Sequence, residues 1–223
     1  MSDKIHKKII LNSLLIPIVI VVIIWLVKFV EVLFDLPLYR LGIFPLSVKG
    51  LPGLLFAPLI HGDFANLYAN TIPLFVLTAA LFYFYREIAL KVFLLIYFFS
   101  NIWLWVGARE VYHIGASGLI YGLAAFLFIS GLIRKNPRLM AISLFVAFLY
   151  GSFIWGIFPE FFPDQNISFE GHFWGIMAGL IIAVYFRKSG PQRKLYSWDL
   201  EDEDEDDEND DNAYWNVPHK GSP

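Results

Sequence analysis

The feature that most constrains this chain is an apolar run near its beginning, IILNSLLIPIVIVVIIWLVKFV at residues 9–30. A helix needs about 20 apolar residues to cross a bilayer, so this run is long enough for one membrane span. Its apolar part is too long for a secretory signal peptide, and no small-residue cleavage site follows it. We therefore expect residues 9–30 to be retained as a first transmembrane helix.

Further apolar runs predict an all-α polytopic membrane protein. Hydrophobic residues make up 57% of the 223 residues and charged residues only 17%, whereas a soluble domain has about a quarter of its residues charged. The later runs contain Gly, Pro or polar residues, so neighbouring helices should shield them from lipid. The six predicted spans are roughly 9–30, 65–85, 89–106, 117–133, 139–158 and 172–186.

The distribution of Lys and Arg predicts the orientation of these spans. Basic residues gather in the segments that stay cytoplasmic. Twelve bases fall on one predicted side: Lys4, Lys7, Lys8, Arg86, Lys91, Arg134, Lys135, Arg138, Arg187, Lys188, Arg193 and Lys194. Four fall on the other: Lys28, Arg40, Lys49 and Arg109. Both termini are therefore expected in the cytoplasm, as an even number of spans requires, and we expect a bacterial plasma membrane.

The segments outside the spans are of two kinds. Residues 35–64 form a large first loop that is apolar yet rich in Pro and Gly, which indicates a loop lying partly in the membrane interface. A second outward loop covers residues 159–171.

Residues 199–211 hold 11 of the 20 acids and no base, so the rest of the chain has 9 acids and all 17 bases. We expect a membrane domain at 1–194 and a disordered acidic cytoplasmic tail at 195–223. That tail is either a solvated appendix or the carrier of AYWNVP (213–218) for a cytoplasmic partner.

Ser117 opens the fourth predicted span within HIGASGLIYG, residues 113–122. Gly118 and Gly122 are four residues apart, a spacing that lets another helix backbone approach closely. Taken alone, this string favours close helix packing over chemistry at the serine.

His172 lies at the start of the sixth predicted span, in GHFWGIMAGL, residues 171–180. Gly175 and Gly179 follow it by three and seven residues, so the three positions share one helix stripe. The histidine should therefore point toward whatever the glycines pack against. Alone, it is equally typical of a histidine that only bonds a neighbouring carbonyl.

The two strings together indicate more than either alone. Each is a small-residue helix face with one reactive side chain near the outer end of its span. If the two faces pack together, Ser117 and His172 come within hydrogen-bonding reach. A serine hydroxyl becomes a good nucleophile when a base takes its proton, and neutral imidazole suits that task near pH 7.

Polar residues also lead into the second predicted span, in HGDFANLYAN, residues 61–70. Asn66 and Asn70 lie on one helix face with His61 before them. An asparagine amide can donate to an oxyanion, which is worth about 3 kcal/mol in serine proteases. The alternative is a helix–helix hydrogen bond worth about 0.6 kcal/mol. Tyr121 lies one turn beyond the serine, where it could stack on the imidazole or simply pack.

These motifs resemble the rhomboid intramembrane serine proteases. The resemblance rests on GASG (115–118) with Tyr121, GHxxGxxxG (171–179) and HxxxxNxxxN (61–70), in this order on these spans, and it covers residues 9 to about 187. It implies a six-transmembrane-helix rhomboid-like bundle and a Ser-His dyad, with Ser117 as nucleophile and His172 as general base. It also implies transmembrane protein substrates and makes loop 159–171 a candidate lid.

The resemblance implies supporting roles for further residues. Asn70 matches the oxyanion-stabilising asparagine, and His61 matches a supporting histidine close to it. Asn66 stands where many rhomboids have a second histidine, and the first loop lacks the frequent Trp-Arg pair. The remaining matches are Gly115 before the nucleophile, Tyr121 against the catalytic histidine, and the packing residues Gly118, Gly122, Gly175 and Gly179.

Other classes of function remain open from the sequence. A catalytically inactive rhomboid-like protein that binds membrane clients would share the fold. A small transporter or channel should show embedded charges along a path, whereas the polar groups here gather at the outer end. The chain has no cysteine, which excludes disulfides and thiolate chemistry. We expect no cofactor, no metal and no nucleic-acid partner, and the lipid bilayer as the surrounding medium.

Overall fold

A computed structural model of the protein describes residues 3–135, 140–141, 144–145 and 168–190. Every regular element in these ranges is helical, and the β contact among them is an isolated bridge between Ile43 and His113. The long helices are α1 (Asp3–Leu33), α3 (Phe64–Phe84), α4 (Ala89–Gly107), α5 (Ser117–Ile133) and α8 (Phe169–Tyr185).

These helices occupy five of the predicted spans. Three of them, over Ile5–Leu33, Phe64–Phe84 and Ala89–Gly107, are long and apolar enough to cross a membrane, while α5 and α8 are apolar but have 17 residues each. The fifth predicted span, 139–158, lies outside the described residues except for four helical positions. Most of loop 159–171 and all of the acidic tail 195–223 also lie outside them.

Local side-chain caps explain where two of the helices begin. The Asp63 carboxylate accepts a hydrogen bond from the backbone N–H of Asn66 at 2.7 Å and starts α3. The Ser168 hydroxyl accepts from the N–H of Gly171 at 3.3 Å and starts α8. Such caps satisfy donors that a helix leaves unpaired in its first turn. Because of the Ser168 cap, α8 begins three residues before the predicted position 172, and the end of loop 159–171 is helical.

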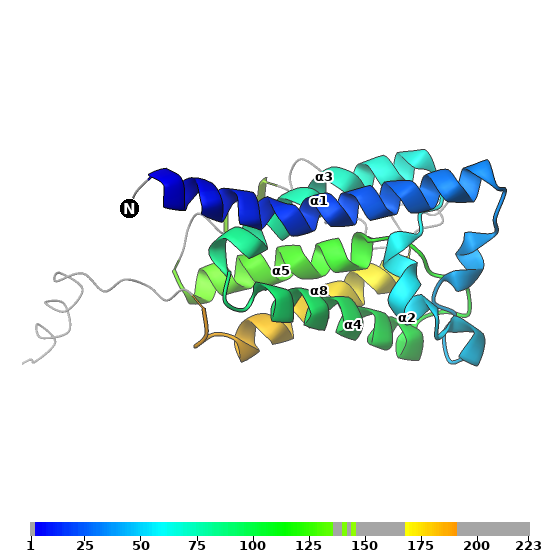
Figure 1. Ribbon diagram of the computed structural model, residues 1–223. Coiled ribbons are helices and arrows are strands. Elements are labelled where there is room, and N and C mark those ends of the chain that lie inside the picture. Colours follow the sequence, from blue (N-terminus) through cyan, green and yellow to red (C-terminus); the bar gives the residue numbers. More distant parts are fainter. Residues whose placement is uncertain (1–2, 136–139, 142–143, 146–167, 191–223) are drawn as a thin grey trace, which may run out of the picture. The chain divides into compact units, whose positions relative to one another are not determined.

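The helices pack in a bundle (Figure 1). Helix α1 lies along α3, while α8 packs against both α5 and α4, and the α5–α8 pair has the most extensive contact. Buried aliphatic and aromatic side chains from α3, α4, α5 and α8 fill the space between them, among them Leu77, Ile96, Leu123, Phe126 and Ile182. Helices α5 and α8 therefore form the rigid centre of the bundle.

The first loop is folded into short helical turns. They are η1 (Leu38–Leu41), η2 (Val48–Gly50), α2 (Gly53–Phe56) and η3 (Ala57–Leu59). Three side chains of α4 hold it: the Asn101 amide donates to the Leu54 carbonyl at 3.1 Å, the Trp105 indole donates to the Ser47 carbonyl at 3.1 Å, and the Tyr97 hydroxyl donates to the Leu55 carbonyl. These bonds satisfy backbone groups of an otherwise apolar loop. Its place in the membrane interface stays a prediction.

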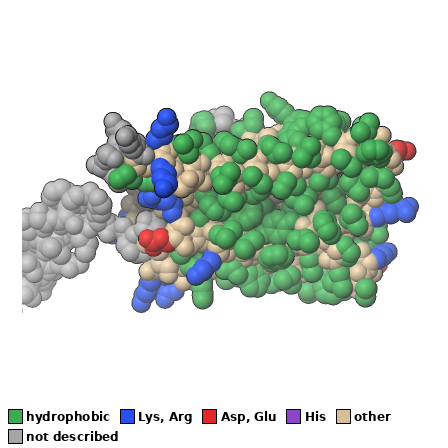
Figure 2. Space-filling view, viewed as in Figure 1, with side chains coloured by type: hydrophobic (Ala, Val, Ile, Leu, Met, Phe, Trp, Pro, Cys, Tyr) green, Lys and Arg blue, Asp and Glu red, His purple; other side chains and the backbone are tan. Residues whose placement is uncertain are grey.

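The surface of the bundle is suited to lipid. Hydrophobic side chains cover the middle of the face in Figure 2, and Lys and Arg side chains lie toward its two ends. Large apolar side chains are exposed along α1, such as Leu15 at 60% and Leu26 at 57%. An apolar exposed surface of this extent is not that of a soluble monomer. The chain is a multi-pass integral membrane protein.

A buried arginine joins α5 and α8 at the end where both helices finish. The Arg134 guanidinium donates to the carbonyl of Phe186 at 2.6 Å and to that of Ser189 at 2.7 Å. It also bonds the Ser130 hydroxyl, which accepts from the Tyr85 hydroxyl at 2.9 Å. A cation here satisfies carbonyls left open at the C-terminus of α8 and complements its dipole.

Candidate active site

The site is built on a close glycine contact between the parallel helices α5 and α8. A Cβ added to Gly175 would lie 2.0 Å from the Gly118 carbonyl oxygen, and one added to Gly179 would lie 2.2 Å from that of Gly122. Real Cβ atoms do not approach an oxygen closer than 3.0 Å. The two backbones thus touch, as in other membrane helix pairs lined by small residues.

Ser117 is the first residue of α5 and is half-buried. Gly115, two residues before it, has φ +108°, a backbone conformation that favours glycine. The N–H of Gly115 donates to the Ala57 carbonyl at 2.9 Å, which holds this turn against the first loop. The turn therefore sets the direction in which Ser117 enters the helix.

His172 lies in the first turn of α8 and is 6% exposed. Its ring is stacked on the ring of Tyr121, with centroids 4.1 Å apart and planes inclined by 12°. Tyr121 follows Ser117 by one helical turn, so both lie on one face of α5. Gly118 and Gly171, the neighbours of Ser117 and His172, also contact each other. The imidazole therefore lies against the face of α5 that carries Ser117.

Asn70 and Asn66 are arranged along the first turns of α3. The Asn70 side-chain amide is buried and donates to the Asn66 carbonyl at 2.8 Å. The same nitrogen makes a second, long contact of 3.5 Å with the Asn66 side-chain oxygen. The Asn66 side-chain oxygen lies 3.9 Å from the place where a Gly115 Cβ would stand. The start of α3 is thus close to the turn that leads into Ser117.

His61 is buried in the connection before α3, with 1% of its surface exposed. Among the residues that the structure describes, neither of its ring nitrogens has a hydrogen-bond partner. Burial is the main cause that lowers its pKa to about 4; the nearby Leu59 carbonyl opposes this shift and the Lys28 ammonium adds to it. The ring is therefore neutral at pH 7.

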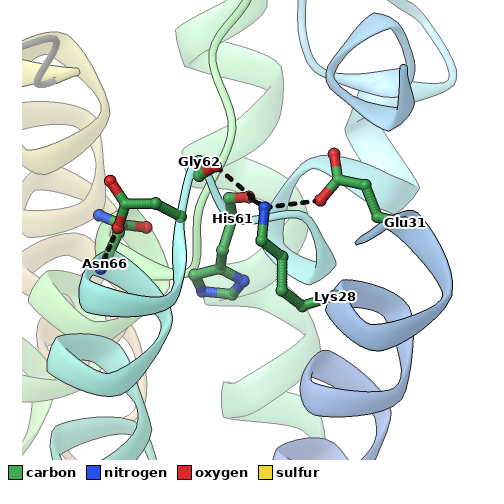
Figure 3. Close-up of polar contacts among 6 residues, drawn as sticks. Lys28, Glu31, His61, Gly62 and Asn66 are labelled. Carbon is green, nitrogen blue, oxygen red and sulfur yellow. Dashed lines mark hydrogen bonds and ion pairs between the residues drawn. The ribbon is translucent and has the colours of Figure 1, made fainter. Parts of the chain in front are cut away.

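Lys28 of α1 supports this connection, a role that the sequence did not indicate. Its ammonium donates to the carbonyls of His61 at 3.0 Å and Gly62 at 2.9 Å and pairs with Glu31 at 2.8 Å (Figure 3). Only 6% of Lys28 is exposed. The sequence placed Lys28 only among the four bases on the outward side. An apolar run does not show that backbone carbonyls of a distant loop will contact a lysine within it.

A pocket lies where α5 and α8 begin. Its polar lining comes from α4, α5 and the segments before α5 and α8. It includes Ser100, Asn101, His113, Ser117 and Ser168. The rest of the lining includes the apolar residues Ile43, Ala57, Leu104 and Ile114, so Ser117 lies on a small pocket with both polar and apolar walls.

Glu170 does not belong to the serine–histidine pair. It lies in the first turn of α8 and pairs with Arg109 at 3.2 Å. A carboxylate there complements the positive end of the helix dipole. No group of three metal-ligating side chains occurs in the part of the chain that the structure describes.

Comparison with known proteins gives the same result as the motifs. The family model described as the Rhomboid domain matches residues 49–189. A protein of Mycobacterium tuberculosis (strain H37Rv) is 36% identical over 185 residues, which is 78% of this chain and 74% of that protein. A protein of Mycobacterium leprae is 34% identical over 177 residues, or 76% and 69%. Both are named only as uncharacterized proteins. The chain belongs to the rhomboid family.

Proposed function

We propose that the protein is an intramembrane serine endopeptidase that cleaves transmembrane segments of other membrane proteins with a Ser117–His172 dyad. The stacking of His172 on Tyr121, one turn from Ser117 on the same helix, is the observation that carries the proposal. The glycine contact between α5 and α8 supports it, because it brings the backbones on either side of the pair together.

In this mechanism Ser117 attacks the scissile carbonyl while His172 takes the hydroxyl proton. The imidazolium then gives this proton to the departing amine, and water hydrolyses the acyl-enzyme with His172 acting again as base. Tyr121 orients the ring by stacking, a task that a carboxylate performs in a triad. An imidazole in its neutral form can accept the hydroxyl proton at pH 7.

The oxyanion of the tetrahedral intermediate requires donors close to Ser117. We assign this role to the side-chain amide of Asn70, whose long contact with the Asn66 oxygen the oxyanion would replace, and to the backbone N–H of Ser117. The first residues of a helix have N–H groups without intrahelical partners, so the Ser117 amide is available for such a bond. His61 and Asn66 support this region, and Gly115 gives the turn its shape.

The substrate and the setting follow from the membrane character of the chain. A transmembrane segment would reach the pocket from within the bilayer and unwind locally to expose one peptide bond. From the distribution of bases we propose that both termini are cytoplasmic, in a bacterial plasma membrane, and that the acidic tail is free to bind a cytoplasmic partner.

Labelling of the purified full chain with a fluorophosphonate tests the proposal. Wild type should be labelled, and Ser117→Ala and His172→Ala should not. Ser13→Ala and His6→Ala are the matched controls, since Ser13 bonds its own helix at the Ile10 carbonyl and His6 is exposed on α1. Cleavage of a panel of single-span reporter proteins should follow the same pattern. Unlabelled wild type would refute the proposal and favour a client-binding protein.

A further inference from the structure

A second serine–histidine pair, His113 and Ser168, lies beside the candidate dyad. The His113 Nδ1 and the Ser168 hydroxyl oxygen are 2.7 Å apart, and the His113 Nε2 is 3.0 Å from the Arg109 carbonyl oxygen. His113 is 2% exposed, and both residues line the pocket that Ser117 faces. The proposed mechanism leaves this pair without a role.

The partners of the pair fix the positions of its protons. The Arg109 carbonyl can only accept, so the Nε2 of His113 must carry a proton. In a neutral ring Nδ1 is then an acceptor, and the Ser168 hydroxyl donates to it. The Ser168 oxygen in turn accepts the N–H of Gly171 at 3.3 Å. Every polar atom of the pair is therefore satisfied in one arrangement only.

The pair joins the two segments that lead into the dyad. His113 precedes Ser117 by four residues, and Ser168 precedes His172 by four. The backbone of His113 is held by Ile43 through bonds of 2.9 and 2.8 Å, and the carbonyl of Ser168 accepts the N–H of His172 at 3.2 Å. A shift of Ser168 is thus passed directly to the backbone of His172.

We propose that His113 and Ser168 are positioning residues that fix the His172 ring relative to the Ser117 hydroxyl. The proposal rests on the proposed protease function. This role requires no contact with the substrate: Ser168 acts through the first turn of α8, and His113 acts through Ser168. The charged groups that face His113 are Arg109 and Glu170, which pair with each other.

Burial keeps the pair in its neutral form. It lowers the pKa of His113 more than the hydrogen bond to the Arg109 carbonyl and the Glu170 carboxylate raise it, and the charge of Arg109 lowers it further. A protonated ring would donate from Nδ1, so the Ser168 oxygen would face two donors and its own hydrogen would lose its acceptor. The arrangement described above is therefore the one present at neutral pH.

The test uses variants that separate the bond from the helix cap. Ser168→Gly removes the hydroxyl, but glycine is tolerated at the N-cap of a helix nearly as well as serine. Ser168→Thr keeps the hydroxyl and serves as the matched rescue. His113→Gln keeps a donor for the Arg109 carbonyl, but its longer side chain has no acceptor at the place of Nδ1.

The rate constant of fluorophosphonate labelling is measured on the full chain in detergent, together with thermal stability. Ser168→Gly and His113→Gln should each label about 10-fold more slowly than wild type, because a small displacement of the base is costly. The double variant should be no slower than the single ones, and Ser168→Thr should label like wild type. If wild type labels and the single variants label as fast as wild type, the positioning role is refuted while the proposed function stands. The same holds if the losses of the two single variants multiply in the double variant. If wild type does not label, the proposed function fails and this inference fails with it.

Discussion

Replacement of Gly175 by alanine tests whether the contact between α5 and α8 positions the dyad. The added Cβ would stand 2.0 Å from the Gly118 carbonyl oxygen and has to reach at least 3.0 Å. Because the obstacle is backbone, no side chain can turn away, and the helices must separate by about 1 Å. Gly118 is bonded to Ser117, so the proposed nucleophile would move away from His172. A misplacement of 1 Å can cost about 100-fold in rate.

The assay is the rate constant of fluorophosphonate labelling, with Gly62→Ala as the matched control. A Cβ at Gly62 would meet nothing within 4 Å, so this variant carries the same chemical change without a clash. We expect Gly175→Ala to label about 100-fold more slowly than wild type and Gly62→Ala to label like wild type. Equal rates for the two variants would show that the helix contact does not set the geometry of the dyad.

Two further predictions concern the connection before α3. Lys28→Met should lower the free energy of unfolding by about 3 kcal/mol, because Glu31 and two carbonyls lose a buried partner. The double variant Lys28→Met/Glu31→Gln should recover part of this lost stability. Unchanged thermal unfolding of Lys28→Met in detergent would contradict the argument. His61 stays neutral in the folded state down to a pKa of about 4, whereas its ordinary value is 6.5. The unfolded state alone gains this proton as the pH falls from 6.5 to 4, so stability should decrease over that window by up to about 3 kcal/mol. The free energy of unfolding of wild type should fall across this pH window relative to that of His61→Leu. A difference in stability between the two proteins that stays constant across the window would contradict the prediction.

The spacing of residues along a helix is what the sequence predicted well. Gly175 and Gly179 share a stripe with His172 because of the helical period, and in the structure all three are buried on the side of α8 that meets α5. The identity of the partner helix was inferred from a second small-residue face at Gly118 and Gly122. Periodicity carries this information because a helix face depends only on local geometry.

The beginning of α8 was predicted less well. Residues 159–171 contain Pro, Asn, Asp and Gly, which favour a loop. The signals for an earlier start were Ser168 as a cap and Glu170 in the first turn. These signals set the start of the helix only when Ser168 is fixed in place by a tertiary contact. The hydrogen bond to His113, 55 residues away, provides that contact.

Lys28 and His113 show what the sequence could not predict. Both are polar side chains with backbone carbonyls among their partners: those of His61 and Gly62 for the lysine, and that of Arg109 for the histidine. A carbonyl has no signature in the sequence, since every residue carries one. The burial of a charge or an imidazole therefore becomes understandable only when the fold shows which carbonyls have no other donor.

The contacts of α5 and α8 explain why a dyad could operate without a carboxylate. The helices are held at one end by Arg134, in the middle by glycine backbones in contact, and at the other end by the bond between His113 and Ser168. A triad carboxylate fixes an imidazole that would otherwise turn. Here the His172 ring lies flat on Tyr121, and its backbone is fixed through Ser168, so the packing itself restricts the rotation. Orientation by packing also adds no further buried charge, which would be costly at membrane depth.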